Sequence, residues 1–571
     1  MIHLVLTVLW LTNLSGTDSY FSIYCLTAAA SLFCLSENRD RPFPRGKKAL
    51  GGGLFFVMML SLAVLLANYK LFYMAREITN LSNRMNHILG MLEGVVTFLA
   101  GIPIFYQILK YFVIRTGQGG YEKTYEAKHP GRFFLLTALM ILLIDLTYLF
   151  LVVYPGNLSH DTMSQLWQIE TGTYNNFTPF WHTQLIRIFM GLGYSLFGTA
   201  NAAAATFCVV QILVMAFAFA YAMMTLYEIR VPKFFLGISL FMYALLPYNI
   251  AFSASIWKDV LYGGAVLLTL AAMYRSMKNV GSHPILDRVV MIFGGVLTCM
   301  ARTNGVYVMM LTFVILVLTL RKRIRKVLIP WMIVGILGCV MNGPILSAMN
   351  IDHIKKVETL SVPLQQVARV VAEEGDISEG DRVLLEKVVD LDSIPEIFWD
   401  ITVDPVKDAL SDGDPDYFFS HKMDYLKLWL RVGTQNPGIY LKAWIDLTRG
   451  YWNGGYDYYT YAEYIADNPY GLETKAAQGM IWRLCKSYFA FTRETILFEP
   501  MLSIGLMVWL TFLSFYLCVI NRKGEAVLYV PLLIIVVCLW VGAPVYSEFR
   551  YLYPLFTLFP LLFPIMLYGE K

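Results

Sequence analysis

Residues 133–156 read FFLLTALMILLIDLTYLFLVVYPG, and runs of this kind decide the fold. From Phe133 to Tyr154 the run carries one charged residue, Asp145, and it stops at Pro155-Gly156, a pair that ends helices. A helix that crosses a bilayer needs about 20 apolar residues. The run therefore predicts a transmembrane helix that ends sharply at a polar loop.

Similar runs recur along the chain, which has 571 residues, of which 57% are hydrophobic and 15% charged. Soluble proteins carry about a quarter charged residues, and disordered chains combine low hydrophobicity with high charge. The composition therefore predicts an all-α polytopic integral membrane protein with about 13–14 transmembrane helices. The first candidate is short enough to be half of a broken helix with the second. The candidates lie at 3–14, 19–36, 50–68, 87–109, 133–154, 201–226, 234–252, 260–275, 288–301, 305–320, 327–348, 500–520, 526–543 and 551–568.

The distribution of lysine and arginine predicts the orientation, because cations favour cytoplasmic loops. Cations gather in alternate loops, at 39–48, 110–132, 230–233, 275–288, 321–326 and 522–523, and at Lys571. The loops between them are poor in cations, and residues 154–180 have none. Both termini are therefore expected to be cytoplasmic.

A different composition begins near residue 350. Residues 350–499 are dense in charge, proline and glycine, with turn signals such as Ser411-Asp412-Gly413-Asp414-Pro415. We expect a mostly helical extracytoplasmic domain there, with amphipathic helices at 382–389 and 422–432. The predicted organisation is a four-span N-terminal extension (1–132), a transmembrane core (133–349), this domain (350–499) and C-terminal helices (500–571).

The loop after the fifth span is the first candidate for chemistry. Ser159 and Asp161 suit the N-cap of a helix that starts near Thr162. An aspartate at the outer face is also placed to take a proton from a hydroxyl group. The apolar stretch that follows, to Leu196-Phe197-Gly198, predicts a helix in the outer interface, with His182 at its start.

Three further outer turns carry polar residues. Lys258 and Asp259 open the eighth span, and charges at a membrane boundary are costly unless paired or hydrated. Arg302-Thr303-Asn304-Gly305 splits two short spans, and arginine suits phosphate because its planar fork binds oxyanions. Glu548 and Arg550 lie in the last turn, where they can pair or where Arg550 meets a second anion.

Each of these turns also has an ordinary interpretation, namely helix caps, snorkelling cations or an interfacial ion pair. Together they lie on one membrane face and supply acids, cations and amides. They include no metal-binding cluster, so no metal or cofactor is predicted, although a divalent cation is not ruled out by the residues. The combination suits a lipid-linked phosphate donor that meets a hydroxyl acceptor at the outer interface.

The motifs resemble those of the polytopic type-C glycosyltransferase superfamily (the GT-C fold), and most closely an uncharacterised bacterial, mainly Firmicute, branch grouped with it. The resemblance covers residues from about 133 to the C-terminus. It rests on Pro155-Gly156-x-x-Ser159-x-Asp161-x-x-x-Gln165, Trp257-Lys258-Asp259, Arg302-x-Asn304-Gly305, 360–369 (LSVPLQQVAR) and Arg550-Tyr551-x-Tyr553-Pro554.

The resemblance implies an inverting glycosyltransferase of the bacterial cell membrane. Its donor would be a sugar on a polyprenyl phosphate, its acceptor an extracytoplasmic glycan, lipid or protein, and no nucleic acid would take part. Asp161 would be the catalytic base and Asp259 a second acid. Many members have two adjacent acids where this chain reads His160-Asp161, which makes His160 a candidate helper. Arg302, Lys258 and Arg550 would bind the donor phosphate; the expected substrate-binding residues are Gln165, His182, Asn304, Gln365, Gln366, Arg369 and Tyr551.

Other hypotheses remain open from the sequence. A glycan polymerase or ligase would use the same spans and the same outer arginines. A flippase or transporter would need acids near the membrane midplane, for which Asp145 and Glu93 are candidates. An inert anchor for a sensory domain would not explain polar clusters in four turns. Aromatic residues at 451–461 are candidates either to stack on sugars or to form a domain core. If the transferase hypothesis is right, Asp161, Asp259, Arg302 and Arg550 should converge on one cavity.

Overall fold

The computed structural model is helical throughout the residues that it describes, which are 1–17, 21–38, 41–43, 46–73, 83–117, 123–319, 325–351, 356–455, 463–475 and 478–569. Within them, β-structure is limited to isolated bridges. All fourteen predicted runs fall on helices. Among the described residues, nine helices are long and apolar enough to span a membrane, or ten if the one bent pair is counted as a span. A polytopic helical membrane protein is therefore confirmed.

The predicted count of 13–14 spans differs from these nine or ten because four of the predicted runs form shorter apolar helices, of 10–17 residues, in the described part of the chain. One of them, Gly305–Thr319, starts where the turn at Arg302 interrupts the apolar sequence. The predicted span at 234–252 is also interrupted, since two helices meet at a 44° bend beside Pro247. The four short helices are Ile2–Leu14, Phe21–Glu37, Gly305–Thr319 and Ile504–Ile520.

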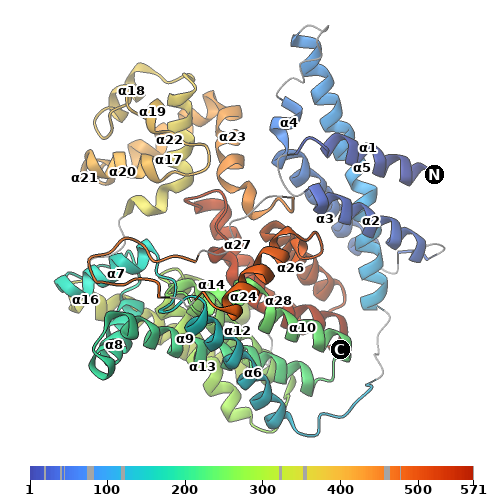
Figure 1. Ribbon diagram of the computed structural model, residues 1–571. Helices are drawn as coiled ribbons and strands as arrows, with labels where there is room; N and C mark the ends of the chain where they lie inside the picture. Colours follow the sequence, from blue (N-terminus) through green and yellow to red (C-terminus); the bar gives the residue numbers. More distant parts are fainter. Residues whose placement is uncertain are drawn as a thin grey trace.

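The N-terminal helices form a group beside the rest of the molecule, drawn in blue in Figure 1. They pack around a small core of their own that includes Trp10, Ala100 and Ile104, each 0% exposed. The helices are α1 (Ile2–Leu14), α2 (Phe21–Glu37), α3 (Lys47–Ala67), α4 (Tyr69–Tyr73) and α5 (Asn83–Gly117).

The transmembrane core is built around α12 (Lys258–Lys278), whose apolar stretch is 94% buried by its neighbours. These neighbours include α9, α13 and α28. The core helices are α6 (Pro130–Leu151), α7 (His160–Thr171), α8 (Phe180–Phe197), α9 (Ala200–Glu228), α10 (Lys233–Leu245), α11 (Pro247–Ser253), α13 (Pro284–Ala301), α14 (Gly305–Thr319), α15 (Arg325–Val340), η1 (Met341–Ile345) and α16 (Leu346–Ala348).

Residues 350–499 are called the loop domain below. Its helices from α17 to α23 form a body at one end of the bundle, whereas α24 packs against the bundle itself (Figure 1). Val370 and Val432, both 0% exposed, lie in the core of that body. The predicted helix at 422–432 appears as α22 (Lys422–Gln435), whereas the one predicted at 382–389 is only partly helical, because α18 (Glu379–Leu385) ends at Leu385. The other elements are η2 (Lys356–Leu360), α17 (Ser361–Ala372), α19 (Ile394–Ile397), α20 (Asp404–Asp412), α21 (Pro415–Ser420), α23 (Pro437–Thr448), η3 (Arg449–Tyr451), α24 (Met480–Glu494) and the first residue of α25 (Glu499–Leu502).

The C-terminal helices return to the bundle and complete the surroundings of α12. They are α26 (Ile504–Ile520), η4 (Gly524–Tyr529), α27 (Val530–Gly542), η5 (Phe549–Leu552) and α28 (Tyr553–Tyr568). The chain therefore brings the start of α12, the end of α13 and the start of α28 to the bundle end that carries the loop domain. That end holds the polar turns singled out in the sequence.

Candidate functional site

Two extended segments hold the loop after α6 in place, one on each side of it. The backbone N–H of Asn157 donates to the carbonyl of Ala254 at 2.9 Å, and the N–H of Ile256 donates back to Asn157 at 2.9 Å. On the other side, Leu158 exchanges backbone hydrogen bonds of 3.0 and 2.8 Å with residues 464 and 466. The loop that precedes α7 is thereby tied to the segment that precedes α12, and also to the loop domain.

Gly156 lets this loop approach α9 and the 254–256 segment. Its φ is +126°, and a Cβ atom there would lie 2.5 Å from the Cys208 sulfur and 2.9 Å from the Ala254 carbonyl oxygen. We expect Gly156→Ala to lower the thermal stability of the purified protein, at a cost of about 1–3 kcal/mol from backbone strain alone. The measurement is the midpoint of heat denaturation in detergent.

Gly172→Ala is the matched control for this prediction. Gly172 is also left-handed, with φ +69°, but nothing lies within 4 Å of the added Cβ. This variant should therefore show the backbone strain without the clash and lose less stability. Equal losses in the two variants would contradict a requirement for close approach at Gly156.

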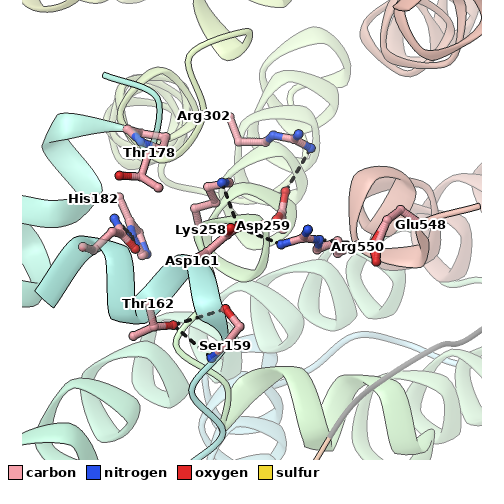
Figure 2. A network of polar contacts seen from close by, with 12 residues as sticks. Ser159, Asp161, Thr162, Thr178, His182, Lys258, Asp259, Arg302, Glu548 and Arg550 are labelled. Carbon is pink, nitrogen blue, oxygen red and sulfur yellow. Dashed lines mark hydrogen bonds and ion pairs between the residues drawn. The ribbon is translucent and has the colours of Figure 1, made fainter. Parts of the chain in front are cut away.

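Asp161 points at cations and does not cap its helix. Ser159 occupies the N-cap of α7, and Asp161 lies in the first turn. Its Oδ2 atom accepts hydrogen bonds from Lys258 Nζ at 3.0 Å and from Arg550 Nη1 at 2.8 Å (Figure 2). Thr162, the next residue, donates through its hydroxyl to the Ile256 carbonyl at 2.7 Å, which fixes α7 against the start of α12. The N-cap interpretation of Asp161 is therefore wrong.

Asp259 forms the second ion pair, with Arg302 Nη1 2.9 Å from its Oδ1 (Figure 2). The Asp259 side chain is 0% exposed, and that of Arg302 is 16% exposed. Within the described part of the chain, neither oxygen of this carboxylate accepts a well-aligned hydrogen bond. Because a buried charge without compensation is costly, Asp259 depends on the charge of Arg302.

Aromatic faces support both arginines. The guanidinium of Arg302 lies 4.8 Å from the ring centre of Tyr551 and 5.7 Å from that of Tyr262. The guanidinium of Arg550 lies 5.4 Å from the ring centre of Trp257 and 5.3 Å from that of Tyr551. Such contacts stabilise a cation that has lost water. Tyr551 thus lies between the two arginines and links the two ion pairs.

The carboxyl groups of the site differ in acidity. Burial alone would raise the pKa of Asp161, but Lys258 and Arg550 outweigh it and hold that pKa well below its ordinary value. Burial raises the pKa of Glu548, although Arg550 Nε donates to its Oε2 at 3.2 Å and acts in the opposite direction. In this arrangement Asp161 is a stable anion, and Glu548 binds a proton more readily than an exposed glutamate.

The lowered pKa of Asp161 predicts a pH dependence of stability. A carboxyl group whose pKa is lower in the folded than in the unfolded protein stabilises the fold above the unfolded pKa, whose ordinary value is 3.8. That contribution is lost as the pH falls through the folded value. The difference in melting temperature between the wild type and Asp161→Asn should therefore be constant above about pH 5 and shrink below about pH 4. A difference that grows on acidification would contradict the ion-pair assignment.

Behind Asp161, α7 packs its amide side chains against α8. Gln165 Nε2 lies 3.0 Å from His182 Nδ1 and 2.8 Å from the Thr183 hydroxyl. Burial lowers the pKa of His182 to about 3, and the nearby Lys258 acts in the same direction. The imidazole is therefore neutral, and its Nε2 atom is buried without a hydrogen-bond partner among the described residues.

Other residues singled out in the sequence make no described contact with the Asp161 cluster or lie only beside it. His160 is exposed, and its ring centre lies 6.3 Å from that of Tyr464. Asn304 shares the turn of Arg302, with its side-chain oxygen buried and unpaired in the described structure. Asp145, the candidate for transport, is 2% exposed within α6, and Glu93 belongs to α5. No described hydrogen bond or ion pair joins His160 or Asp145 to the Asp161 cluster.

The polar side chains predicted on α17 form hydrogen bonds and ion pairs within the loop domain. Gln365 donates to the Trp399 carbonyl at 2.6 Å, and Gln366 accepts from the Trp429 indole at 2.9 Å. Arg369 donates to Asp446 Oδ2 at 2.7 Å. The three residues do share one side of a helix, as their spacing predicts. The resemblance implies that these residues bind substrate, but in the described structure no hydrogen bond or ion pair joins them to the Asp161 cluster.

Asp446 is also the point where the N-terminal group meets the loop domain. The carboxylate is 0% exposed, and its Oδ2 atom accepts from the Tyr69 hydroxyl at 2.7 Å. Lys70 Nζ lies 3.5 Å from the same oxygen and 3.0 Å from Asp400 Oδ2. Arg369 is therefore one member of an ion-pair network that joins α4 to α17 and α23.

The pairing of Glu548 with Arg550 was predicted from the last turn, but the sequence alone did not assign a role to Tyr262 or to the indole of Trp257. The sequence did contain a signal for them, because each lies within three residues of a charged residue that was predicted to belong to the site. Tyr451, considered for sugar stacking, is 0% exposed and donates to the Val545 carbonyl at 2.8 Å, so it is a packing residue. Trp452, considered for the same role, is 4% exposed, and the remaining aromatics of that hypothesis, Tyr456, Tyr458, Tyr459 and Tyr461, lie outside the described residues.

Comparison with known proteins gives a family and no relative of established activity. A family model described as a family of unknown function (DUF6020) matches residues 137–570. This range includes Asp161, Lys258, Asp259, Arg302 and Arg550, and leaves α1–α5 outside. No curated protein and no solved structure matches the chain.

Proposed function

The chain belongs to a family of unknown function (DUF6020), and from its own site we propose that it is a membrane glycosyltransferase of the GT-C type. The proposed reaction transfers a sugar from a polyprenyl-phosphate donor to a hydroxyl group of an extracytoplasmic glycan, lipid or protein. The observation that carries the proposal is the convergence of Asp161, Lys258, Asp259, Arg302 and Arg550 from four separate turns.

The residue types suit this reaction. Three cations lie together, and cations at that position would offset the negative charge that grows on a leaving phosphate. Lys258, Arg302 and Arg550 have side chains 15–19% exposed, so each is partly accessible. The cluster lies where transmembrane helices begin or end, as a lipid-linked substrate with its headgroup at the interface requires.

In the proposed mechanism, Asp161 takes the proton of the acceptor hydroxyl group. The hydroxyl oxygen attacks the anomeric carbon from the side opposite the phosphate, and the bond from that carbon to the phosphate oxygen breaks. The electron pair leaves with the phosphate, whose added charge Arg302, Lys258 and Arg550 stabilise. Attack from the opposite side inverts the configuration of the sugar.

The test uses the full-length protein in nanodiscs with radiolabelled polyprenyl-phosphate sugars, one donor at a time, and a cell-envelope extract as acceptor. We expect one donor to release polyprenyl phosphate and to label the acceptor. A second assay places the protein and the same donors in sealed vesicles. It measures whether the donor lipid moves from one leaflet to the other without losing its sugar. Movement between leaflets without cleavage of the sugar–phosphate bond would overturn the transferase proposal in favour of a flippase.

A polymerase or ligase would be distinguished by its products. Such an enzyme would join two lipid-linked glycans and would label a chain of increasing length. A single transferred sugar is the result expected here.

A further inference from the structure

The two cations on Asp161 raise a chemical difficulty for a base. Lys258 Nζ and Arg550 Nη1 both donate to the same oxygen, Oδ2, at 3.0 and 2.8 Å. A carboxylate held in this way has little affinity for a proton, whereas a general base works best when its pKa is near the working pH. The site as it stands therefore holds its base in an unreactive form.

We propose that the phosphate of the lipid-linked donor takes Lys258 and Arg550 from Asp161, so that Asp161 can accept the proton of the acceptor only when donor is bound. This inference rests on the proposed function and adds a regulation of the same site by its substrate. The ligand class that it names is a phosphate ester on a lipid.

The charges of the cluster support an exchange of partners. Three carboxylates, Asp161, Asp259 and Glu548, face three cations, Lys258, Arg302 and Arg550. These charges balance, so an incoming phosphate adds uncompensated negative charge to a largely buried cluster. The other titratable groups that face it are His182, Tyr262, Tyr451 and Tyr551. The three cations can stabilise the phosphate when one carboxylate gives up its share of them, and the proton that this carboxylate then takes from the acceptor offsets the negative charge that the departing phosphate gains.

Burial decides which carboxylate gives up its cations. Arg302 compensates Asp259, which is 0% exposed, and its departure would leave a fully buried charge. Asp161 is 30% exposed, the most of the three carboxylates, so water can replace part of what it loses. The Nε atom of Arg550 donates to Glu548, and this hydrogen bond can stay when the Nη groups exchange Asp161 for a phosphate. Glu548 therefore keeps the guanidinium oriented during the exchange.

The exchange links the two halves of the reaction. As the bond between the anomeric carbon and the phosphate oxygen breaks, negative charge grows on the phosphate and draws Lys258 and Arg550 more strongly. As these cations leave, the carboxylate of Asp161 regains its affinity for a proton. The acceptor proton then moves to Asp161 while the acceptor oxygen bonds to the anomeric carbon. Charge moves from the carboxylate to the phosphate, and the cations follow it.

The proposal makes a prediction about binding that a merely structural role for Asp161 does not make. If Asp161 competes with phosphate for the same cations, Asp161→Asn should bind a lipid phosphate more tightly, by about tenfold. The probes are decaprenyl phosphate, decaprenol and inorganic phosphate, titrated against the full-length protein in phosphatidylcholine nanodiscs. Decaprenol measures the lipid contribution alone, and inorganic phosphate measures the phosphate contribution alone.

Further variants complete the design. Glu548→Gln removes a carboxylate that pairs with one of the two contested cations, Arg550, and not with Lys258. Its gain in affinity for decaprenyl phosphate should therefore be smaller than that of Asp161→Asn. In the Lys258→Gln background, Asp161→Asn should gain less, since one of the contested cations is absent. Asp424→Asn, at an exposed carboxylate of the loop domain, should bind like the wild type. Asp161→Ser replaces Asp161→Asn if the latter does not fold.

The outcomes separate the two levels of the hypothesis. Tighter binding of decaprenyl phosphate by Asp161→Asn, with smaller gains in the comparison variants, supports the exchange. Unchanged or weaker binding, or an equal gain in Glu548→Gln, overturns the exchange and leaves the transferase proposal standing. A wild-type protein that does not distinguish decaprenyl phosphate from decaprenol overturns both.

Discussion

Asp161→Asn is expected to lower the rate of sugar transfer by about 10²–10⁴-fold, the range that a positioned base contributes. The amide cannot take the acceptor proton, although it is nearly the same size as the carboxylate and can still accept hydrogen bonds from Lys258 and Arg550. The loss should appear in kcat, while tighter donor binding lowers KM. The measurement is a steady-state transfer assay with the donor identified by the nanodisc screen.

The control for this prediction is Asp424→Asn, which changes the same functional groups at an exposed position of α22. It should retain wild-type transfer and wild-type stability. Activity near the wild-type level in Asp161→Asn would show that Asp161 is not the base. Glu548, the acid whose pKa burial raises, would then be the residue to examine next.

Arg302→Ala is the second substitution with a large expected effect, and it should act first on folding. Asp259 is 0% exposed, and its ion-pair partner Arg302 would be gone. Removing one member of a buried ion pair typically costs about 3–5 kcal/mol because the other charge stays buried. We therefore expect a marked loss of protein that elutes as a single species after heating, measured by fluorescence-detected size-exclusion chromatography.

A double substitution separates the structural role of Arg302 from its proposed role in catalysis. Asp259→Asn together with Arg302→Gln removes both charges and leaves two amides able to pair, so most of the stability should return. Transfer should remain low, because the phosphate has lost one of its three cations. Arg187→Ala, at an exposed arginine of α8, is the control for loss of an arginine. A stable and active Arg302→Ala protein would contradict both roles.

Much of the architecture could be predicted from local sequence, because a membrane span must be apolar along its whole length and must satisfy its own backbone hydrogen bonds. For the same reason the positions of the polar turns could be predicted, since few charges interrupt those runs. The number of spans could not be predicted from composition alone. Helix length depends on where a turn such as Arg302–Gly305 forms and on the neighbours that cover it.

The group on α17 shows the limit of reading motifs. Gln365, Gln366 and Arg369 do lie on one side of a helix, as their spacing indicates, and that side is buried. The surface that buries it belongs to the loop domain and, through Asp446, to α4. The spacing of three polar residues determines the side of a helix but says nothing about which partner covers that side.

The amino-acid sequence by itself determined two things about this chain, because both follow from local composition. It is a polytopic helical membrane protein, and a small set of its charged residues lies in a few turns between apolar runs. Only the tertiary structure decided which charge meets which. Lys258 and Asp259 are neighbours in the chain, yet Lys258 pairs with Asp161 and Asp259 with Arg302. Successive side chains on a helix point in directions about 100° apart, so the packing of α7, α13 and α28 around the start of α12 chooses their partners.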